Sequence, residues 1–419
     1  VSSLTQTVYV DGYVVFTNSM SSNSWTSTAT GRVSLGANYS TSASAYANFF
    51  DGLIDQVRIY NTTLSASQVL QLYNEKPEID TSNFRALLYK GTSSKQYISN
   101  VGFNLDVDNG GDGGYVWIKQ RTTPTRHHRN YDTVRGVYPL YSSLANAEGT
   151  SNPIEYDANG FFFAGGESGV NENAEDYVAW VWRGGGTPVQ NNDGTIQGSN
   201  CLVSANTDAG FSIVKYTGNN TDNATVGHGL GVAPNIVIVK DLDSSNYWCV
   251  GGSTVGDGKN LYLNDRELRQ TRDRVKSVQT NTFTLGNHFE TNSTNDFIAY
   301  CFAQKNGFSR ISTYEGDGTA DNKIYTTDDG TSTGSHGFKP SFVMLKNMDR
   351  TNTGWLIHDT ARDPVNTSYL TLYAQSDIQE YDSTSYWLMD FESDGFRLKY
   401  GGDNEFNKSG DTFLFMAFK

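Results

Sequence analysis

Large and small apolar residues alternate in a phrase that recurs three times along the chain. The copies are residues 177–182 (YVAWVW), 297–302 (FIAYCF) and 413–418 (FLFMAF). Each copy follows a polar turn that contains Asn and Asp. Short apolar runs that follow turn residues are typical of buried strands. We therefore expect each phrase to be a buried strand that closes one unit of a repeat.

Three further phrases recur in the same order. The first covers 84–91, 211–218 and, one residue longer, 308–316. The second ends in Lys119, Lys240 and Lys346, and the third covers 160–163, 281–285 and 394–398. Short strands at regular spacing are typical of two-sheet sandwiches. The sequence therefore predicts an all-β protein with three tandem β-sandwich modules, at 84–186, 211–307 and 308–419, and a flexible or crossing linker at 187–210.

Residues 1–78 carry a different series of short alternating strands, at 7–12, 13–16, 31–36 and 49–60. A helical pattern follows at 64–73, where Ser65 and Gln68 form a candidate capping box. The segments YVDG, LG and FDGLIDQVRIYN resemble the laminin-G-like, concanavalin-type jelly roll, of which only the C-terminal half is present. The missing strands either lie upstream of this chain or come from a neighbour. The resemblance implies sugar binding, in some members through calcium.

Composition agrees with an all-β protein, since 13% of the residues are aromatic and 42 are Gly. The formal net charge of −14 argues against binding to nucleic acid. No apolar run approaches the roughly 20 residues needed to cross a bilayer, so we expect no membrane insertion. The sequence begins at Val1 and shows no signal peptide, so we expect its numbering to start inside a longer or processed polypeptide.

The chain has three cysteines, Cys201, Cys249 and Cys301. A small, odd number of cysteines does not indicate a disulfide framework. Cys301 stands where the other closing phrases have Val181 and Ala417. We therefore expect Cys301 to be a small buried packing residue.

Calcium binding is one hypothesis for the glycine-rich turn at 106–114 (DVDNGGDGG). Asp106, Asp108 and Asp112 could converge oxygen ligands on Ca²⁺, although the twelfth position of the loop is Trp117 instead of the usual glutamate. An ordinary solvated turn is the alternative. Asp51 and Asp55 allow the same two interpretations.

The remaining polar motifs indicate structure rather than catalysis. His228 and His336 precede prolines at matching places and stand apart from other ligands, so we expect turn anchors. His127 and His128 are adjacent and would point apart, which disfavours chelation by this pair. The glycine-rich 227–231 lacks the lysine and the helix of a phosphate loop.

Two Asp-x-x-Arg motifs, Asp132 with Arg135 and Asp359 with Arg362, recur at matching places and predict structural ion pairs or turns. We identify no catalytic residues and predict that the protein is not an enzyme. The 45 acidic residues leave a glycosidase-type carboxylate pair as an alternative.

Several aromatic side chains could stack on sugar rings, although we expect most aromatic residues to lie in cores. The candidates are Trp25, Tyr39, Tyr247, Trp248, Trp355, Tyr381, Tyr386 and Trp387.

The phrases YVWIK, GFSIVKYTG, VGHGLGVAP and FIAYCFA resemble an uncharacterised domain family of tailed-phage virion proteins, common in phages of marine bacteria. The resemblance covers about 84–419, and the third copy departs most, with SHGFKP at 335–340. It implies a non-enzymatic protein of the virion surface, such as an appendage, tail fibre or capsid decoration. We expect it to contact other virion proteins and copies of itself, as a homo-oligomer such as a trimer, and to bind a host-surface glycan. A secreted bacterial carbohydrate-binding adhesin and a glycan depolymerase are the alternatives.

Overall fold

A computed structural model describes residues 4–10, 13–20, 38–40, 45–47, 64, 65, 69 and 83–419, except 152, 383 and 384. The chain divides into two compact units, Val1–Asp80 and Thr81–Lys419. The fold is all-β, as the sequence predicts.

In the first unit, β1 (Leu4–Val10) pairs with β2 (Tyr13–Met20), and β3 (Asn38–Ser40) pairs with β4 (Ala45–Ala47), both antiparallel. The N–H of Val69 donates to the Ser65 carbonyl at 2.9 Å, which is a helical hydrogen bond inside the expected helix. The predicted strands at 31–36 and 49–60, and Gln68 of the capping box, lie outside the described residues.

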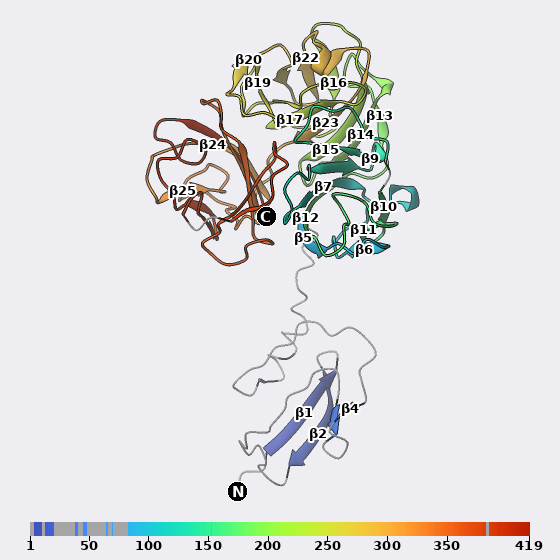
Figure 1. The fold of residues 1–419 in the computed structure, drawn as a ribbon, viewed down its shortest axis with the longest axis vertical. Helices are drawn as coiled ribbons and strands as arrows, with labels where there is room; N and C mark the ends of the chain where they lie inside the picture. The colour runs from blue at the N-terminus through green and yellow to red at the C-terminus, as the bar shows by residue number, and fades with distance from the viewer. Residues whose placement is uncertain are drawn as a thin grey trace. The chain divides into compact units, whose positions relative to one another are not determined.

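The second unit holds three groups of strands, which we call modules 1, 2 and 3, and each group contains a larger and a smaller antiparallel sheet (Figure 1). In module 1 the larger sheet comprises β5 (Phe84–Lys90), β12 (Asp176–Arg183), β7 (Gly114–Gln120), β8 (Arg129–Asp132) and β9 (Gly136–Leu140). Its smaller sheet comprises β10 (Ile154–Asp157), β11 (Gly160–Phe163) and β6 (Gln96–Ser99), and a 3₁₀ turn covers Val107–Asn109.

The larger sheet of module 2 has more strands than the larger sheet of either other module. In spatial order it comprises β13 (Val189–Asn191), β14 (Gly198–Asn206), β15 (Phe211–Thr217), β23 (Asp296–Phe302), β17 (Ile236–Asp241), β18 (Cys249–Gly251), β19 (Lys259–Tyr262) and β20 (Gln270–Thr271). The smaller sheet comprises β16 (Ala224–Gly227), β22 (Thr282–Leu285) and β21 (Val275–Val278), and a short helix α2 covers Phe289–Asn292.

Module 3 repeats the arrangement of module 1 with one more strand. Its larger sheet comprises β24 (Ser309–Glu315), β32 (Thr412–Phe418), β26 (Phe342–Asn347), β27 (Trp355–Asp359), β28 (Leu370–Tyr373) and β29 (Tyr381–Asp382). Its smaller sheet comprises β25 (Asn322–Tyr325), β31 (Gly395–Leu398) and β30 (Met389–Glu392).

One expectation is corrected here. The range 187–210, expected as a linker, forms strands β13 and β14 of the module 2 sheet. Its polar, glycine-rich composition is compatible with an outer strand, because only alternate residues, such as Cys201 and Val203, enter the core.

The three closing phrases form β12, β23 and β32, and both faces of each strand are buried. In β12, Tyr177, Ala179 and Val181 face the core between the two sheets of module 1. The alternate residues, Val178, Trp180 and Trp182, enter a second core that all three modules share. Strands covered on both faces are apolar throughout, which explains why these phrases contain no polar position.

The shared core holds the three modules together around a common centre (Figure 1). At this centre the final aromatic residues of the closing strands, Trp182, Phe302 and Phe418, meet with ring centroids 5.5 to 6.1 Å apart. Large aromatic side chains contribute the most buried apolar area per residue. The modules are therefore not independently packed domains, because each contributes side chains to the core that the other two share.

The same backbone hydrogen bond joins each neighbouring pair of modules. Glu148 N–H donates to Leu242 O at 2.9 Å, Arg269 N–H to Met348 O at 2.8 Å, and Glu380 N–H to Arg121 O at 2.8 Å. Each acceptor lies two residues after one of the strand lysines. Because the third bond returns from module 3 to module 1, the modules form a closed ring with near-threefold repetition.

The first repeated phrase is also structural in every copy. Tyr89, Tyr216 and Tyr314 each stack on the first aromatic residue of their closing strand, at 4.9 to 5.2 Å. Their hydroxyls donate to buried backbone carbonyls at 2.7 to 2.8 Å. The extra residue of the third copy falls before the strand, since Ser309 pairs with Phe418 as Phe211 pairs with Phe302.

Candidate functional site

The recurring charged residues serve the ring rather than a reaction. Lys119, Lys240 and Lys346 are fully buried, and their Nζ atoms donate to carbonyls, those of Gln120 at 2.7 Å and Asp241 at 2.6 Å and that of Thr353. Burial lowers the pKa of Lys119 and Lys240 to about 8 and the pKa of Lys346 to about 7. No substrate-sized opening reaches these amines, since their exposure is 0%.

Both Asp-x-x-Arg motifs form buried ion pairs, as the sequence predicts. Arg135 Nε lies 2.6 Å from Asp132, and Arg362 Nε lies 2.6 Å from Asp359. Each aspartate also accepts from the closing strand of a neighbouring module: Tyr300 OH at 2.7 Å and Trp180 Nε1 at 3.0 Å, respectively. The motif therefore ties adjacent modules together.

The histidines are explained by local contacts. His128 Nδ1 accepts from Trp117 Nε1 at 2.8 Å, so Nε2 carries the proton and donates to Tyr373 O at 2.9 Å, across modules 1 and 3. His228 is buried, and its ring bonds to Leu230 N and Gln279 O, which anchors the turn as expected. Burial lowers the pKa of both rings and keeps them neutral.

The other histidines and the cysteines also have structural surroundings. His127 Nδ1 lies 3.1 Å from Ser143 Oγ, and His336 Nδ1 lies 3.3 Å from Asp328. Cys201, Cys249 and Cys301 are free and buried, and all three line the core of module 2. Burial raises the pKa of Cys201 to about 11, so this thiol stays protonated at neutral pH.

The three candidate calcium ligands lie at the turn before β7, but with separate partners. Asp106 caps the 3₁₀ turn by accepting from Asn109 N and Nδ2, at 3.2 and 2.6 Å. Asp112 pairs with Arg183 at 2.7 Å, and Asp108 lies within the turn itself. Within the described ranges, no three His, Cys, Asp or Glu residues are grouped so that they could hold a metal ion. Asp51 and Asp55 lie outside the described residues, and calcium binding stays a prediction.

The candidate aromatic residues divide between core and surface. Trp248 and Trp355 are buried in the shared core, and their indole N–H groups donate to the carbonyls of Tyr141 and Tyr262, each in a neighbouring module. Tyr247, Tyr381 and Tyr386 are 40 to 45% exposed. Trp25 and the side chain of Tyr39 lie outside the described part of the chain.

A cleft of about 600 Å³ lies where module 2 meets module 3, and it brings Tyr381 and Trp387 together. Module 2 contributes the turn after β19. Module 3 contributes the turn between β26 and β27, the end of β28, the following loop, β29 and Trp387, which lies between β29 and β30. The lining residues are Asn264, Asp265, Arg266, Asn352, Tyr373, Gln375, Ser376, Ile378, Tyr381 and Trp387. Because the two walls come from different modules, the cleft exists only in the closed ring.

One wall of the cleft is aromatic. Tyr381 and Trp387 lie with ring centroids 5.1 Å apart and planes inclined at 59°. Trp387 meets Tyr373 edge to face, with centroids 5.8 Å apart. These contacts hold the rings in place, while 40% of Tyr381 remains exposed. Fixed aromatic rings at a wet surface offer an apolar face with a polar edge.

Tyr373 joins these rings to a polar part of the cleft, which is held by a network around Glu405. This carboxylate accepts from Arg266 Nη2 at 2.6 Å, Gly354 N at 2.9 Å and Tyr373 OH at 3.1 Å. Arg266 also donates to the carbonyl of Asn352, which binds module 2 to module 3. Burial, together with the charge of Glu405, raises the pKa of Tyr373 and keeps its hydroxyl a donor.

Planar polar groups remain available at the cleft surface. Gln375 Oε1 accepts from Trp355 N–H at 2.8 Å, which fixes the amide, and its Nε2 makes no hydrogen bond to a described residue. The Arg266 side chain is 52% exposed. Asp265 is the only carboxylate among the described lining residues, since Glu405 lies behind the wall and is fully engaged. The described lining of the cleft therefore offers rings for stacking and planar polar groups for hydrogen bonding.

Some residues of this site escaped the sequence analysis. Tyr381 and Trp387 were candidates, but Arg266, Gln375 and Glu405 carry no local motif, and they meet only through the contact of two modules. No motif distinguishes the buried Asn171, Asn292 and Asn407 in the sequence, yet the Oδ1 atom of each accepts from the N–H of the residue after a repeated glycine. All three asparagines stand in the polar turn that precedes a closing phrase, and this recurrence is the sequence signal that could have identified them.

No described helix is long and apolar enough to cross a membrane. No curated protein and no solved structure matches the chain. Residues 1–70 match the concanavalin A-like lectin/glucanases superfamily, which confirms the jelly-roll resemblance of the N-terminal part. Residues 80–419, which are more than half of the chain and include the whole ring of modules, match a domain of unknown function (DUF7483). The chain therefore belongs to the DUF7483 family.

Proposed function

We propose that the protein is a non-enzymatic adhesion protein that binds glycan through the cleft between modules 2 and 3. The single observation that carries this proposal is that one cleft is lined by the adjacent rings of Tyr381 and Trp387 and by the amide of Gln375 and the guanidinium group of Arg266. A sugar ring has an apolar C–H face, which stacks on an aromatic ring, and a rim of hydroxyls, which pair with planar polar groups. A cleft of about 600 Å³ has room for a short oligosaccharide.

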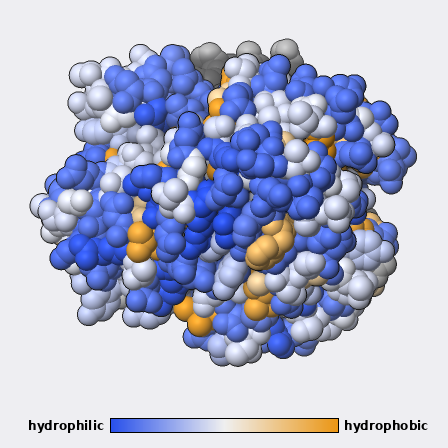
Figure 2. Space-filling model, turned by 90° about the horizontal axis from the view of Figure 1, so that it is seen from above, coloured by the Kyte–Doolittle hydropathy of each residue, from blue (hydrophilic) through white to orange (hydrophobic). Residues whose placement is uncertain are grey.

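Two further observations support an adhesive role. The face of the molecule in Figure 2 is largely hydrophilic with small separate apolar spots, which suits binding through polar groups at a wet surface. The N-terminal match to a lectin and glucanase superfamily adds a second unit of a sugar-binding fold type to the same chain. On the resemblance to tailed-phage virion proteins, we place this adhesion on the surface of a phage particle, in an appendage, tail fibre or capsid decoration that contacts host glycan.

A glycan array probed with the full chain tests the cleft. We expect binding that falls at least about fivefold in Tyr381→Ala and in Trp387→Ala, if a sugar ring gains as much from stacking on an aromatic ring as the about 1–3 kcal/mol that a nucleobase gains. Tyr97→Ala is the matched control, because Tyr97 is a similarly exposed tyrosine of module 1 that does not line the cleft. If all three variants retain binding on the array, the cleft is not the glycan-binding site.

Two measurements address the alternatives. Release of oligosaccharide from a host envelope by the purified chain would indicate a depolymerase and overturn the non-enzymatic role. Electron microscopy of purified particles should show the chain on the virion, and its absence there would favour a secreted bacterial adhesin. Loss of glycan binding in EDTA, with the cleft variants unaffected, would move the binding site to a calcium-dependent location such as the N-terminal unit.

A further inference from the structure

The outer edge of the larger sheet is covered in module 2 and open in module 3. In module 2, β14 pairs along β15 over six residue pairs, from Cys201 with Tyr216 to Asn206 with Phe211. In module 3, β24 occupies the place of β15 next to the closing strand, and it is the first strand of its sheet. Module 3 therefore lacks the strand that module 2 carries at this edge.

The covering segment of module 2 also closes the side of the sandwich. Cys201 and Val203 of β14 enter the core between the sheets, and Ile196 joins them. Ile196 forms a parallel bridge with Val226 of β16, and its N–H donates to Thr225 O at 3.0 Å. Residues 196–206 thus contact both sheets and shield the core at this side from water.

The corresponding side of module 3 is a groove of about 330 Å³ between β24 and β25. Its lining includes Arg310, Ser312 and Tyr314 of β24. By register, Ser312 stands where module 2 has Val214, which is fully buried under β14. Ser312 and Tyr314 are only partly buried, so this side of the module 3 sandwich is less covered than the same side of module 2.

Some hydrogen-bonding groups along the groove lack partners. Both backbone groups of Ser309 bond to Lys305 on the outer side of β24, so the alternate residues Ile311, Thr313 and Glu315 also direct their backbone groups outward. The carbonyl of Ile311 accepts from Asn235 Nδ2 at 3.3 Å, and that of Glu315 accepts from Asn322 Nδ2 at 3.2 Å, so the free part of the edge is centred on Thr313. Within the described part of the chain, the N–H and C=O of Thr313 have no partner on that side. The Nε of Arg310 is buried and likewise makes no hydrogen bond. Burial lowers the pKa of Arg310, which reflects the loss of water around its charge.

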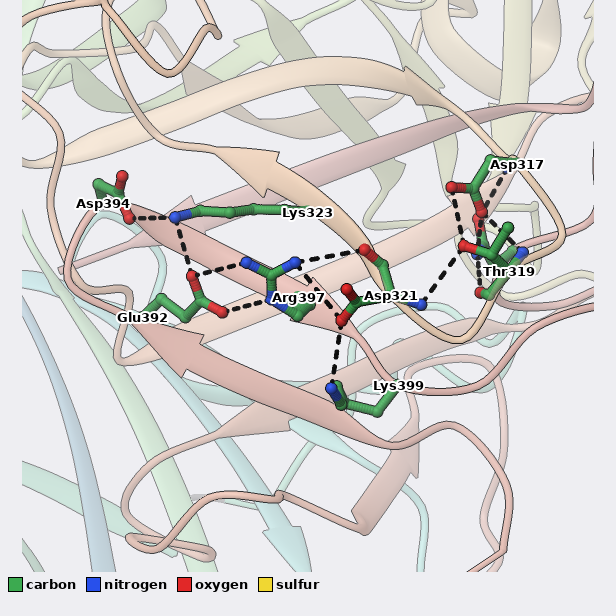
Figure 3. A network of polar contacts seen from close by, with 9 residues as sticks. Asp317, Thr319, Asp321, Lys323, Glu392, Asp394, Arg397 and Lys399 are labelled. Atoms are coloured by element: carbon green, nitrogen blue, oxygen red, sulfur yellow. Dashed lines mark hydrogen bonds and ion pairs between the residues drawn. The ribbon is translucent and has the colours of Figure 1, made fainter.

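On β25 and the strands beside it, the charged side chains pair with one another (Figure 3). Lys323 of β25 lies 2.8 Å from both Glu392 and Asp394, and Arg397 of β31 pairs with Glu392 at 2.6 Å. These strands therefore do not favour a strongly charged ligand. The unpaired groups are instead those that a polypeptide backbone satisfies.

We propose that the groove between β24 and β25 binds an extended segment of a different polypeptide, which pairs with β24 as β14 pairs with β15. The segment carries small apolar residues at alternate positions, as β14 carries Cys201 and Val203, and uncharged polar residues between them. One of its carbonyls accepts from Arg310 Nε. β14 is itself paired along β15 and does not supply this strand. The surface is separate from the glycan cleft and serves assembly with another protein.

A fluorescent peptide with the sequence of residues 194–206 (GTIQGSNCLVSAN) is the probe, added to the full chain under reducing conditions. We expect saturable binding by anisotropy and slower amide hydrogen exchange within 309–315. A peptide of the same composition in scrambled order should not bind. Absence of saturable binding, or protection at another site only, would overturn the proposal.

Two variants locate the binding. Arg310→Ser, which introduces the residue that module 2 has in the same register, should weaken the peptide about tenfold, and Thr313→Pro should abolish binding by removing the edge N–H. Lys399→Ala is the control, because Lys399 pairs with Asp321 outside the groove. Unchanged affinity in Arg310→Ser would overturn the groove as the site. Sedimentation that shows self-association lost in Thr313→Pro would assign the edge to a second copy and overturn the choice of partner.

Discussion

The shared core makes a sharp prediction for Trp182, which contacts aromatic residues of all three modules. Its ring lies 4.8 Å from Phe84, 6.1 Å from Phe302 and 5.5 Å from Phe418, and the residue is 2% exposed. Trp182→Ala removes roughly 200 Å² of buried apolar surface, which corresponds to about 5 kcal/mol by area and to about 3–5 kcal/mol in measured series. We therefore expect a loss of about 4 kcal/mol.

This loss should fall on the whole ring and not on module 1 alone. The unit Thr81–Lys419 has about 340 residues, so its entropy of unfolding is about 0.7 kcal/mol/K and the melting temperature should fall by about 6 °C. The assay is differential scanning calorimetry of the full chain, together with urea unfolding followed by tryptophan fluorescence and far-UV circular dichroism.

The matched control is Trp182→Phe. Phe302 and Phe418 occupy the same place in the other modules, and the Nε1 of Trp182 makes no hydrogen bond that Phe would lose. We expect this variant to lose less than about 1.5 kcal/mol. An early transition of module 1 in Trp182→Ala, with the remaining transition at the wild-type temperature, would refute the idea that the three modules share one cooperative core.

Three further predictions concern buried groups. Asp359→Ala should cost about 3–5 kcal/mol in denaturant unfolding, because it removes the buried carboxylate that Arg362 Nε and Trp180 Nε1 both contact and leaves Arg362 with Glu380 alone. Asp321→Ala, which removes a side chain that is 69% exposed, should cost no more than about 1 kcal/mol, and equal costs would contradict the role of burial. The pKa of Lys346 is about 7 in the folded chain and about 10.4 in the unfolded chain. Between pH 7 and pH 10.4 the unfolded state therefore binds more protons than the folded state, and the free energy of unfolding rises by at most about 1.4 kcal/mol per pH unit. Urea unfolding at pH 7 and 9 should show wild type gaining stability relative to Lys346→Met, and a pH-independent difference would refute this. Gly218→Ala should lower the melting temperature strongly, because a Cβ would lie 2.0 Å from Ser293 O, while Gly165→Ala, with no atom within 4 Å, should not; similar melting temperatures would contradict the close approach.

The all-β class and the structural role of the repeated phrases could be predicted from the sequence because both depend on local patterns. A strand buried on both faces must be apolar at every position, so the closing phrases stand out without any knowledge of their partners. The Asp-x-x-Arg motif is similar, since its two residues are close in sequence and their pairing is local. The equivalence of Cys301 with Val181 and Ala417 likewise identified a packing position, and Cys301 is fully buried.

The range 187–210 shows the limit of local pattern. Its glycine and polar residues indicated a linker, yet β14 is a strand because β15 offers it an open edge. Pairing to an edge depends on a neighbour that lies elsewhere in the chain, and composition alone does not report it.

By itself, the sequence determined the all-β class, the closing strands and the repetition of four phrases, because these follow from periodicity within short segments. Only the tertiary structure decided that the three modules close into one ring. Alternate residues of each closing strand are buried against the other two modules, and an apolar strand does not indicate in its sequence what it packs against. The candidate glycan cleft follows from that closure, whereas the open edge of β24 arises because module 3 has no counterpart of β14. Arg266, Glu405 and Tyr381 are far apart in sequence, and long-range packing alone brings them to one site.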